Sequence, residues 1–330
     1  MLAVKPPASA AGGKSEVELC DWPDPEVRPG EVVVDIRATA LNRADLLQMR
    51  GLYPPPPGES EVPGLECSGV VESVGPGVEG FSPGDRVMAL LAGGGHAEKV
   101  AAPAGQLMPI PPGWSFEEAA ALPEVAITAW TNLVAEGGLE EGETVLVVAA
   151  ASGVGSFTVQ LARELGARVL AAGRSMERLE KLRPLGADGC VVLGEGFVER
   201  ARELNDGRGV DLILDLAGGD GMGPRCKALR SGGRAVLVGI LAGSKTTLDL
   251  GDVLRRRLRV IGSVLRSRPR EEKARLIADF SSFAGHRLAD GRLRPVIDRT
   301  YPLQRAGDAY ADLERGGVLG KVVLTVPADR

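Results

Sequence analysis

Apolar and polar positions alternate with two different periods along the chain, and the change between them divides the sequence. Up to about residue 122, short runs with the two-residue period of β-strands are separated by Gly and Pro. These runs predict strands at 31–38, 66–74, 85–91 and 97–101, and one helix at 42–50. An antiparallel, barrel-like domain is therefore expected for this part of the chain.

From residue 144 to residue 263, apolar strand-like runs alternate with helix-like stretches. Such alternation is typical of βαβ units, whose strands form a parallel sheet. Six strands in this alternation make one complete doubly wound sheet of the Rossmann type. The predicted strands are 144–149, 168–172, 190–193, 212–216, 234–238 and 259–263, with helices at about 154–165, 176–185, 198–205 and 222–230.

The tail from about residue 266 is too short to form a domain alone. It predicts a helix at 270–283 and short strands at 296–297 and 320–326, and we expect it to pack back on the first domain. The predicted organisation is therefore a catalytic domain from 1–122, a dinucleotide-binding domain from 123–265 and a return to the first domain over 266–330.

Composition and charge argue against several classes of protein. The 39 Lys and Arg against 44 Asp and Glu give a net charge of −5, which does not favour a nucleic acid or an anionic membrane as partner. No apolar run approaches the ~18 residues of a membrane span. The N-terminus lacks the apolar stretch of a signal peptide. The four cysteines lie far apart, with no CxxC pair, so a disulfide framework is not indicated. A cytoplasmic protein is expected.

The sequence offers little for hydrolysis or metal chemistry. Its two histidines, His96 and His286, each lack a second His nearby, so the common His-based zinc motifs are absent. No GxSxG nucleophile elbow occurs either. Each His is expected to be an ordinary satisfied or solvated imidazole, and no metal site is predicted.

The clearest motif follows the strand at 144–149, where the run AASGVG turns directly into a helix. Small residues let the chain turn tightly and let backbone amides approach a diphosphate at the helix N-terminus. Because the turn lies inside the six-strand alternation, it predicts a dinucleotide site. The alternative is a plain strand–helix turn. The residues expected to bind the cofactor here are Ser152, Gly153, Val154 and Gly155.

The end of the second strand indicates which dinucleotide. Gly173 lies twenty residues after Gly153, where an NAD enzyme places an acid against the ribose 2′-hydroxyl. This chain has Gly173, Arg174 and Ser175 there, with Arg178 one helical turn later. Guanidinium groups pair well with a 2′-phosphate, so NADPH is favoured over NADH. The alternative is that both arginines are surface residues at the start of a helix and bind no phosphate.

Two later strand ends complete the predicted cofactor site. Ligands of open α/β sheets bind at the carboxyl ends of the strands. Gly239 follows the fifth strand, and Val264, Leu265 and Arg266 follow the sixth, so we expect all four to face the nicotinamide half of the cofactor. The alternative is that these are ordinary strand exits.

Many short segments, in the same order, resemble the medium-chain dehydrogenase/reductase superfamily. The similarity is to its zinc-free quinone oxidoreductases related to zeta-crystallin, in particular the branch that includes the tumour-suppressor-inducible quinone oxidoreductase, and it extends over essentially the whole chain. The segments that carry it are 40–46 (ALNRADL), 51–56 (GLYPPP), 64–69 (GLECSG), 84–91, 93–95, 122–124 (LPE), 128–130 (TAW), 151–155 (ASGVG), 185–188 (LGAD), 265–268 (LRSR) and 320–321.

The resemblance implies a GroES-like, β-barrel-type catalytic domain and a Rossmann domain, with NADPH held in the cleft between them. Zinc-dependent members carry a Cys near the start of the first helix and Gly-His-Glu in the next strand. Here Asn42 and Gly64-Leu65-Glu66 stand at those places, so a metal-free reaction is implied. The resemblance also assigns cofactor contacts to Asn42, Thr128 and Lys321, and pocket positions to Asn42, Asp45 and Tyr53.

These pocket residues suit the reduction of a quinone, which develops negative charge on oxygen as it accepts hydride. The Asn42 amide and the Tyr53 hydroxyl are donors that can stabilise that charge. Tyr53 is one source of the proton, and solvent is another. An equally weighted alternative is that the Tyr53 ring clamps the proline loop. Asp45 is expected to orient its neighbours or to cap a helix.

The sequence therefore predicts an NADPH-dependent, metal-free quinone oxidoreductase acting on a quinone or a similar conjugated carbonyl. One alternative is an enoyl or alkenal reductase, and another is an NADPH-binding protein with little turnover. The resemblance implies a homodimer joined through the sixth strand, from Arg259 to Ser263. No specific nucleic acid and no membrane partner are expected.

Overall fold

The computed structural model describes residues 1–7 and 16–328, which form two compact units. Unit 1 consists of Met1–Glu124 and Arg266–Arg330, and unit 2 of Val125–Leu265. The boundaries expected from the sequence, after residues 122 and 265, lie within two residues of these. None of the described helices combines the length and the apolar character needed to cross a membrane.

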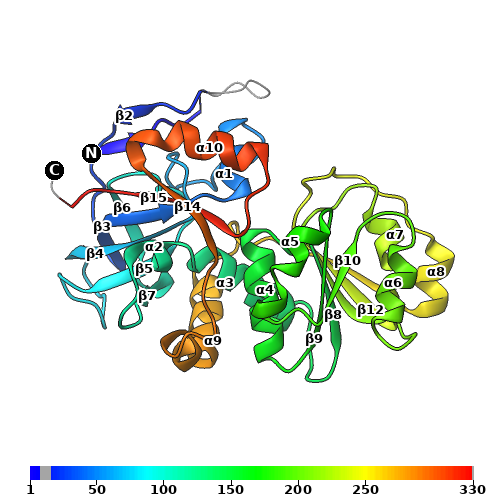
Figure 1. The fold of residues 1–330 in the computed structure, drawn as a ribbon. Helices are drawn as coiled ribbons and strands as arrows, with labels where there is room; N and C mark the ends of the chain where they lie inside the picture. The colour runs from blue at the N-terminus through cyan, green and yellow to red at the C-terminus, as the bar shows by residue number, and fades with distance from the viewer. Residues whose placement is uncertain (8–15, 329–330) are drawn as a thin grey trace. The chain divides into compact units, whose positions relative to one another are not determined.

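Unit 1 is built on a seven-stranded sheet in the order β14-β15-β3-β4-β5-β7, with β6 paired to β3 (Figure 1). All of its pairs are antiparallel except β14 with β15. The expected antiparallel domain is confirmed, and the four predicted strands correspond to β3 to β6. The strands of unit 1 are β1 (Leu2–Val4), β2 (Leu19–Asp21), β3 (Glu31–Ala40), β4 (Glu66–Val74), β5 (Arg86–Leu90), β6 (Lys99–Pro103), β7 (Leu107–Pro109), β14 (Ile297–Pro302) and β15 (Lys321–Thr325).

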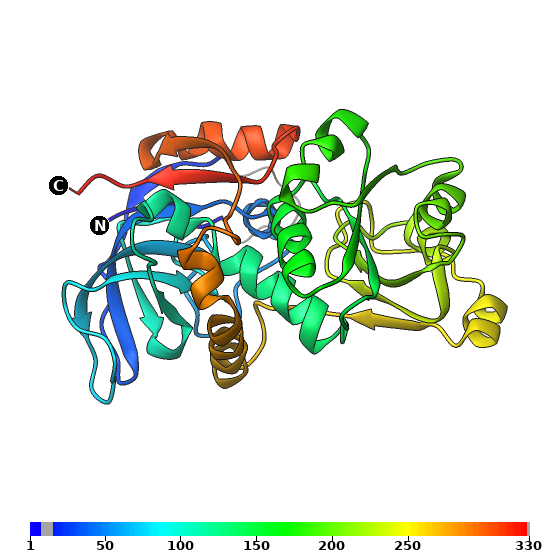
Figure 2. The ribbon, with the colours of Figure 1, turned by 60° about the horizontal axis from the view of Figure 1, so that its bottom comes forward.

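Helices α2 and α10 pack against this sheet, and the C-terminal part of the chain supplies α9, η4 and α10. Helix α10 was not predicted, although Ala306, Ala309, Tyr310 and Leu313 have helical spacing; all four are buried in the unit 1 core. Figure 2 shows α10 running beside β15. The helical segments are α1 (Arg43–Met49), η1 (Ala104–Gln106), α2 (Phe116–Ala120), α9 (Arg270–Ala289), η4 (Leu303–Arg305) and α10 (Ala306–Arg315), and α3 (Pro123–Trp130) begins at the unit boundary.

Helix α9 extends six residues beyond its predicted end at residue 283. The buried Ala284 and Leu288 continue its apolar face, so the longer helix buries more apolar surface. Gly285 does not stop it, because its backbone keeps a negative φ. The expected return of the tail to the first domain is confirmed by the pairing of β15 with β3.

Unit 2 is a six-stranded sheet in the order β10-β9-β8-β11-β12-β13, and all neighbouring strands are parallel. This is the order of a complete doubly wound sheet, so the predicted Rossmann architecture is confirmed. The strands are β8 (Thr144–Val148), β9 (Arg168–Gly173), β10 (Gly189–Val192), β11 (Val210–Asp215), β12 (Leu229–Leu237) and β13 (Arg259–Gly262).

Helices α4 and α5 lie on one side of this sheet, and α6, α7 and α8 lie on the other (Figure 1). The helix predicted at 176–185 is interrupted, since Pro184 has no N–H and only a 3₁₀ turn follows α5. The helix predicted at 222–230 ends at Cys226, because β12 already pairs with β11 from Leu229. The helical segments are η2 (Thr131–Ala135), α4 (Gly153–Glu164), α5 (Met176–Glu180), η3 (Arg183–Leu185), α6 (Phe197–Glu203), α7 (Met222–Cys226) and α8 (Leu250–Arg256), of which η2 and α8 were not predicted.

Candidate functional site

The glycine-rich turn of unit 2 joins the fully buried strand β8 to helix α4. Ala149 holds a left-handed backbone (φ 58°), which is uncommon for a residue with a side chain. Ser152 caps the helix, its Oγ accepting a hydrogen bond from the Gly155 N–H at 3.1 Å. A Cβ on Gly155 would lie 2.6 Å from the Ala149 carbonyl oxygen, so only glycine lets helix and strand approach this closely.

This turn fits a dinucleotide. Helix α4 is twelve residues long, and the first N–H groups of an α-helix have no partner within the helix. Gly153 and Val154 remain partly exposed at its start, where a diphosphate can accept from these groups. Residues Ser152 to Gly155 thus form the turn and helix start that the sequence predicts. Their contact with a cofactor stays a prediction.

Strand β9 ends at Gly173, and the residues predicted to select the cofactor follow it. Arg174 is exposed and Arg178 is half-buried. Ser175 is the N-cap of α5, since its Oγ accepts from the Arg178 N–H at 3.4 Å. A guanidinium therefore stands at the strand end where an acid is typical of NAD enzymes.

The other residues of unit 2 that were predicted to contact the cofactor lie after strands or in a helix. Gly239 follows β12, Val264 and Leu265 follow β13, and Thr128 lies in α3. A Cβ on Gly239 would lie 2.6 Å from the Leu216 carbonyl oxygen, so the exits of β11 and β12 touch there. Val264 is 45% exposed, whereas Leu265 and Thr128 are buried. The Thr128 carbonyl accepts from the Asn132 side chain at 2.7 Å.

Asp215, at the carboxyl end of β11, was not singled out from the sequence and organises this edge of the sheet. Its Oδ1 accepts the N–H groups of Ala217 and Gly218, both at 2.9 Å, and its Oδ2 accepts from Arg225 Nε at 2.7 Å. Both charged side chains are buried. Asp215 and Arg225 therefore hold the loop after β11 in place. Removing either side chain would leave the other charge buried and unpaired, which is costly.

Unit 1 contains a buried polar cluster that joins three distant parts of the chain. Lys321 Nζ donates to Asn42 Oδ1 and to Glu66 Oε1, each at 2.6 Å. Asn42 Nδ2 donates to the same Glu66 oxygen at 2.9 Å and to the Ala40 carbonyl at 3.3 Å. Lys321 and Glu66 are 3% and 0% exposed. Both N–H groups of the Asn42 amide are thus used inside the protein.

Glu124 completes this cluster at the start of α3. Its backbone N–H donates to Glu66 Oε2 at 2.9 Å. Burial, and then the carboxylate of Glu66, raise the pKa of Glu124 to about 8. No role was predicted for Glu66 or Glu124, although both lie in segments that carry the family resemblance. Only the tertiary structure shows that the two residues are in contact.

Asp45 acts as a positioning residue, as expected. Its Oδ2 accepts the Asn42 N–H at 2.6 Å, which forms a capping box at the start of α1, and its Oδ1 accepts the Gly64 N–H at 3.1 Å. The side chain is 0% exposed. These bonds hold Asn42 and the 64–66 segment in one arrangement.

His96, which had no predicted role, lies behind Asp45 in the core. Its Nδ1 is 2.7 Å from the Tyr310 hydroxyl, and its Nε2 is 3.9 Å from Asp45 Oδ2. Burial lowers the pKa of His96 below its ordinary 6.5, and the nearby Asp45 only partly opposes this. His96 is therefore a neutral, buried imidazole, whereas His286 is exposed.

Tyr53 and Arg266 form a second group of polar side chains in unit 1. The Arg266 guanidinium lies 5.1 Å from the centre of the Tyr53 ring and donates to the Tyr53 carbonyl (3.0 Å), the Ala92 carbonyl (2.7 Å) and Gln48 Oε1 (2.7 Å). Arg266 belongs to unit 1, and these bonds commit its guanidinium to the loops around Tyr53. Burial and the neighbouring Glu124 raise the pKa of Tyr53.

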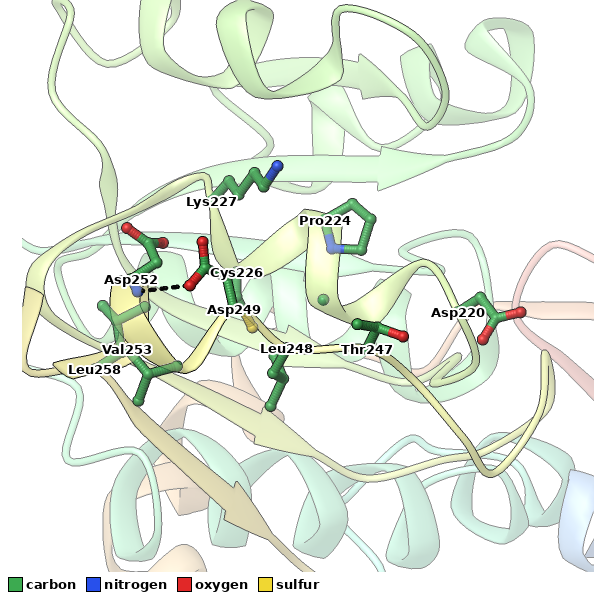
Figure 3. Close-up of a pocket in the computed structure, with 11 residues that line it drawn as sticks. Asp220, Pro224, Cys226, Lys227, Thr247, Leu248, Asp249, Asp252, Val253 and Leu258 are labelled. Atoms are coloured by element: carbon green, nitrogen blue, oxygen red, sulfur yellow. Dashed lines mark hydrogen bonds between the residues drawn. The ribbon is translucent and has the colours of Figure 1, made fainter. Parts of the chain in front are cut away.

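A separate pocket of about 300 Å³ lies in unit 2, among α7, α8 and the segment before α8 (Figure 3). None of the predicted site residues lines it. Its Asp249 already caps α8 by accepting the Asp252 N–H at 3.0 Å. Within residues 1–7 and 16–328, no group of three or more His, Cys, Asp or Glu is arranged to hold a metal ion.

Comparison with known proteins identifies two family models that match this chain. Residues 28–112 match the model "Alcohol dehydrogenase GroES-like domain", and residues 153–282 match "Zinc-binding dehydrogenase". The quinone oxidoreductase of Rattus norvegicus is 30% identical over 320 residues, which cover 95% of this chain and 94% of that protein. The chain belongs to the medium-chain dehydrogenase/reductase superfamily of oxidoreductases.

Other similar proteins are much longer than this chain. The spectinabilin polyketide synthase system protein NorB of Streptomyces orinoci is 36% identical over 327 residues, which cover 96% of this chain and 14% of NorB. The chain spans only 6% to 15% of the length of five polyketide synthases that it matches.

Two solved structures are similar over nearly the whole chain. One, described as an NAD-dependent alcohol dehydrogenase, has a TM-score of 0.87, 36% identity and coverage of 99% of this chain and 100% of its own. The quinone oxidoreductase of Thermus thermophilus, described together with its NADPH complex, has a TM-score of 0.81, 36% identity and coverage of 96% and 98%.

The buried His96 predicts a specific dependence of stability on pH. Its pKa is lower in the folded than in the unfolded protein, so the unfolded state binds more protons as pH falls below about 6.5. The free energy of unfolding should therefore decrease over that range. Urea titrations between about pH 8 and pH 5 should show a smaller decrease in His96→Gln than in the parent protein.

The matched control is His286→Gln, which removes the other, exposed histidine. It should leave the pH dependence of unfolding unchanged. An identical pH dependence in the parent protein and His96→Gln would contradict the assignment of His96 as a buried neutral group.

Proposed function

We propose that this chain is an NADPH-dependent, metal-free reductase of quinones. The observation that carries the proposal is the cluster in which the Lys321 ammonium bonds both Asn42 and Glu66. Zinc-dependent relatives place Cys and His ligands where this chain has Asn42 and Leu65. Here the Lys321 ammonium supplies the positive charge beside Glu66. It already bonds the Asn42 amide oxygen and the Glu66 carboxylate.

The residues of unit 1 suit a substrate oxygen that becomes negative during reduction. The buried Lys321 and Arg266 contribute positive potential to this part of the protein, where low dielectric strengthens their effect. The half-buried Tyr53 offers a hydroxyl group as a hydrogen-bond donor. The nicotinamide cofactor, when bound, supplies the hydride.

Support for NADPH comes from the end of β9. Gly173, Arg174 and Ser175 place no acid there that would repel a 2′-phosphate. The similar Thermus thermophilus quinone oxidoreductase is described with NADPH, whereas the similar alcohol dehydrogenase is described as NAD-dependent. Arg174 is therefore the residue on which the cofactor proposal depends.

A second candidate function is reduction of an enoyl group. It is favoured by the 36% identity to a polyketide synthase over nearly the whole chain, because polyketide synthases include enoylreductase segments. Quinones and enones are both conjugated carbonyls that accept a hydride, so the same site chemistry would serve either.

We also propose pairing of two chains through β13. This strand is at one edge of the unit 2 sheet, with Val260 43% exposed. An exposed apolar edge strand is a ready site for pairing with another chain.

The substrate is tested by the rate of NADPH oxidation with 1,2-naphthoquinone and with an alkenal, in each case before and after dialysis against EDTA. We expect faster turnover of the quinone and no loss of rate after EDTA. Faster turnover of the alkenal would favour the enoyl-reducing candidate. Absence of turnover with both, despite NADPH binding, would contradict both enzymatic proposals.

Cofactor selection is tested by Arg174→Ala. Loss of a charge-assisted contact to the 2′-phosphate should raise the KM for NADPH by about ten-fold or more, and should change the KM for NADH by less than about two-fold. Arg208→Ala, at an exposed arginine elsewhere in unit 2, is the control and should change neither constant. Equal effects of Arg174→Ala on both cofactors would remove Arg174 from the 2′-phosphate site.

Pairing through β13 is tested by light scattering. We expect the parent protein to have the mass of a dimer and Val260→Asp to have the mass of a monomer, since a carboxylate on the pairing edge opposes association. Val192→Asp is the control and should keep the mass of a dimer, because Val192 is exposed on β10 at the other edge of the same sheet. A monomeric parent protein would contradict the proposal.

A further inference from the structure

The reduction proposed above needs a proton as well as a hydride. We infer that Glu124 is the acid that donates this proton to the reduced substrate. The inference rests on the proposed function and identifies a catalytic residue that the comparisons do not name.

The balance of the step is simple. The hydride brings two electrons to the conjugated carbonyl and leaves a negative charge on its oxygen. The O–H bond of the Glu124 carboxyl then breaks, and its proton goes to that oxygen. The carboxylate takes a proton from water before the next cycle, so that one NADPH and one proton are consumed for each quinone reduced.

Among the carboxyl groups of the unit 1 cluster, only that of Glu124 is available for this role. Glu66 is fully buried and bonded to Lys321 and Asn42. Asp45 is fully buried, and both of its oxygens accept backbone N–H groups. Within the part of the chain that the structure describes, no hydrogen bond or ion pair engages the Glu124 carboxyl, and the residue is mostly buried but keeps some solvent exposure.

The position of Glu124 is nevertheless well defined. Pro123 starts α3, and the Glu124 N–H is fixed on Glu66 Oε2 at 2.9 Å. Its carboxyl is close enough to Tyr53 and Arg266 to influence the titration of both. Glu124 thus interacts electrostatically both with the buried Lys321 cluster and with Tyr53 and Arg266.

The charges around Glu124 explain why it can hold a proton at neutral pH. Burial is the largest influence, the carboxylates of Glu66 and Asp45 add to it, and the pKa reaches about 8. Lys321 and Arg266 oppose this rise without cancelling it. The titratable groups that interact with Glu124 are Glu66, Asp45, Lys321, Arg266, Tyr53 and Lys273.

The other polar groups of the site are less suited to donate. Both N–H groups of Asn42 are bonded to Glu66 and Ala40, and Lys321 is 3% exposed with two short bonds. Tyr53 is a weak acid whose pKa is raised further by burial and by Glu124 itself. A general acid works best when its pKa lies near the working pH, which favours Glu124 over Tyr53.

The first test is a direct titration of the cofactor-free protein by infrared difference spectroscopy between about pH 5 and pH 10. The stretching band of a protonated carboxyl should disappear with a midpoint near pH 8. The band should be absent from Glu124→Gln and present in Glu79→Gln, which changes an exposed glutamate of the same unit. A Glu124 carboxyl that is already ionised at pH 6 would overturn the inference.

The second test is the pH profile of quinone reduction. The parent protein should lose activity as pH rises through about 8, because the acid form is needed. Glu124→Gln should lower kcat by about 100-fold or more and lose this limb of the profile, with the Kd for NADPH unchanged. Glu124→Asp, which restores a carboxyl group, should recover part of kcat.

The outcomes separate this inference from the function on which it rests. If the parent protein reduces quinones and Glu124→Gln keeps its kcat and pH profile, the proposed function stands and the inference is wrong. If the parent protein reduces neither quinones nor enones, both are overturned. A uniform loss of NADPH binding in Glu124→Gln would show a structural role instead of proton donation.

Discussion

The ammonium of Lys321 inside unit 1 is the charge on which the candidate site depends. It reaches Glu66 and Asn42 at 2.6 Å each, and so connects β15, near the C-terminus, to β4 and to the start of α1. Breaking a buried ion pair by removing one partner typically costs about 3–5 kcal/mol, because the other charge is left unpaired. The return of the C-terminal segment to the first sheet is therefore a requirement of the site as well as of the core.

One ammonium does not neutralise all the carboxyl groups around it. Glu66 takes the direct contact, and Asp45 is stabilised by two backbone N–H groups, that of Asn42 in the capping box and that of Gly64. Glu124 receives neither kind of partner and accommodates burial by holding its proton more tightly, with a pKa of about 8. The same crowding that is unfavourable for three carboxylates therefore produces one group with acid chemistry at neutral pH.

Unit 2 shows how backbone packing prepares a ligand site. Gly155 allows α4 to approach β8, and Gly239 allows the exits of β11 and β12 to touch. Asp215 and Arg225 then fix the loop that follows β11. These features place exposed main-chain groups and Arg174 at the carboxyl ends of the strands, the side of a doubly wound sheet where ligands bind.

The sequence by itself determined the elements whose signal is local. Buried strands alternating with helices defined the parallel sheet, and the small residues at Ser152 to Gly155 defined the turn before α4, because both depend on the period of apolar positions and on the space needed near the backbone. The helix start at Asn42 and Asp45 was readable for the same reason. Only the tertiary structure decided that Lys321 bonds Glu66, that Tyr310 meets His96, and that the Glu124 N–H bonds Glu66. These contacts join residues from separate parts of the chain, and their electrostatic effects depend on distance and burial, which no local pattern records.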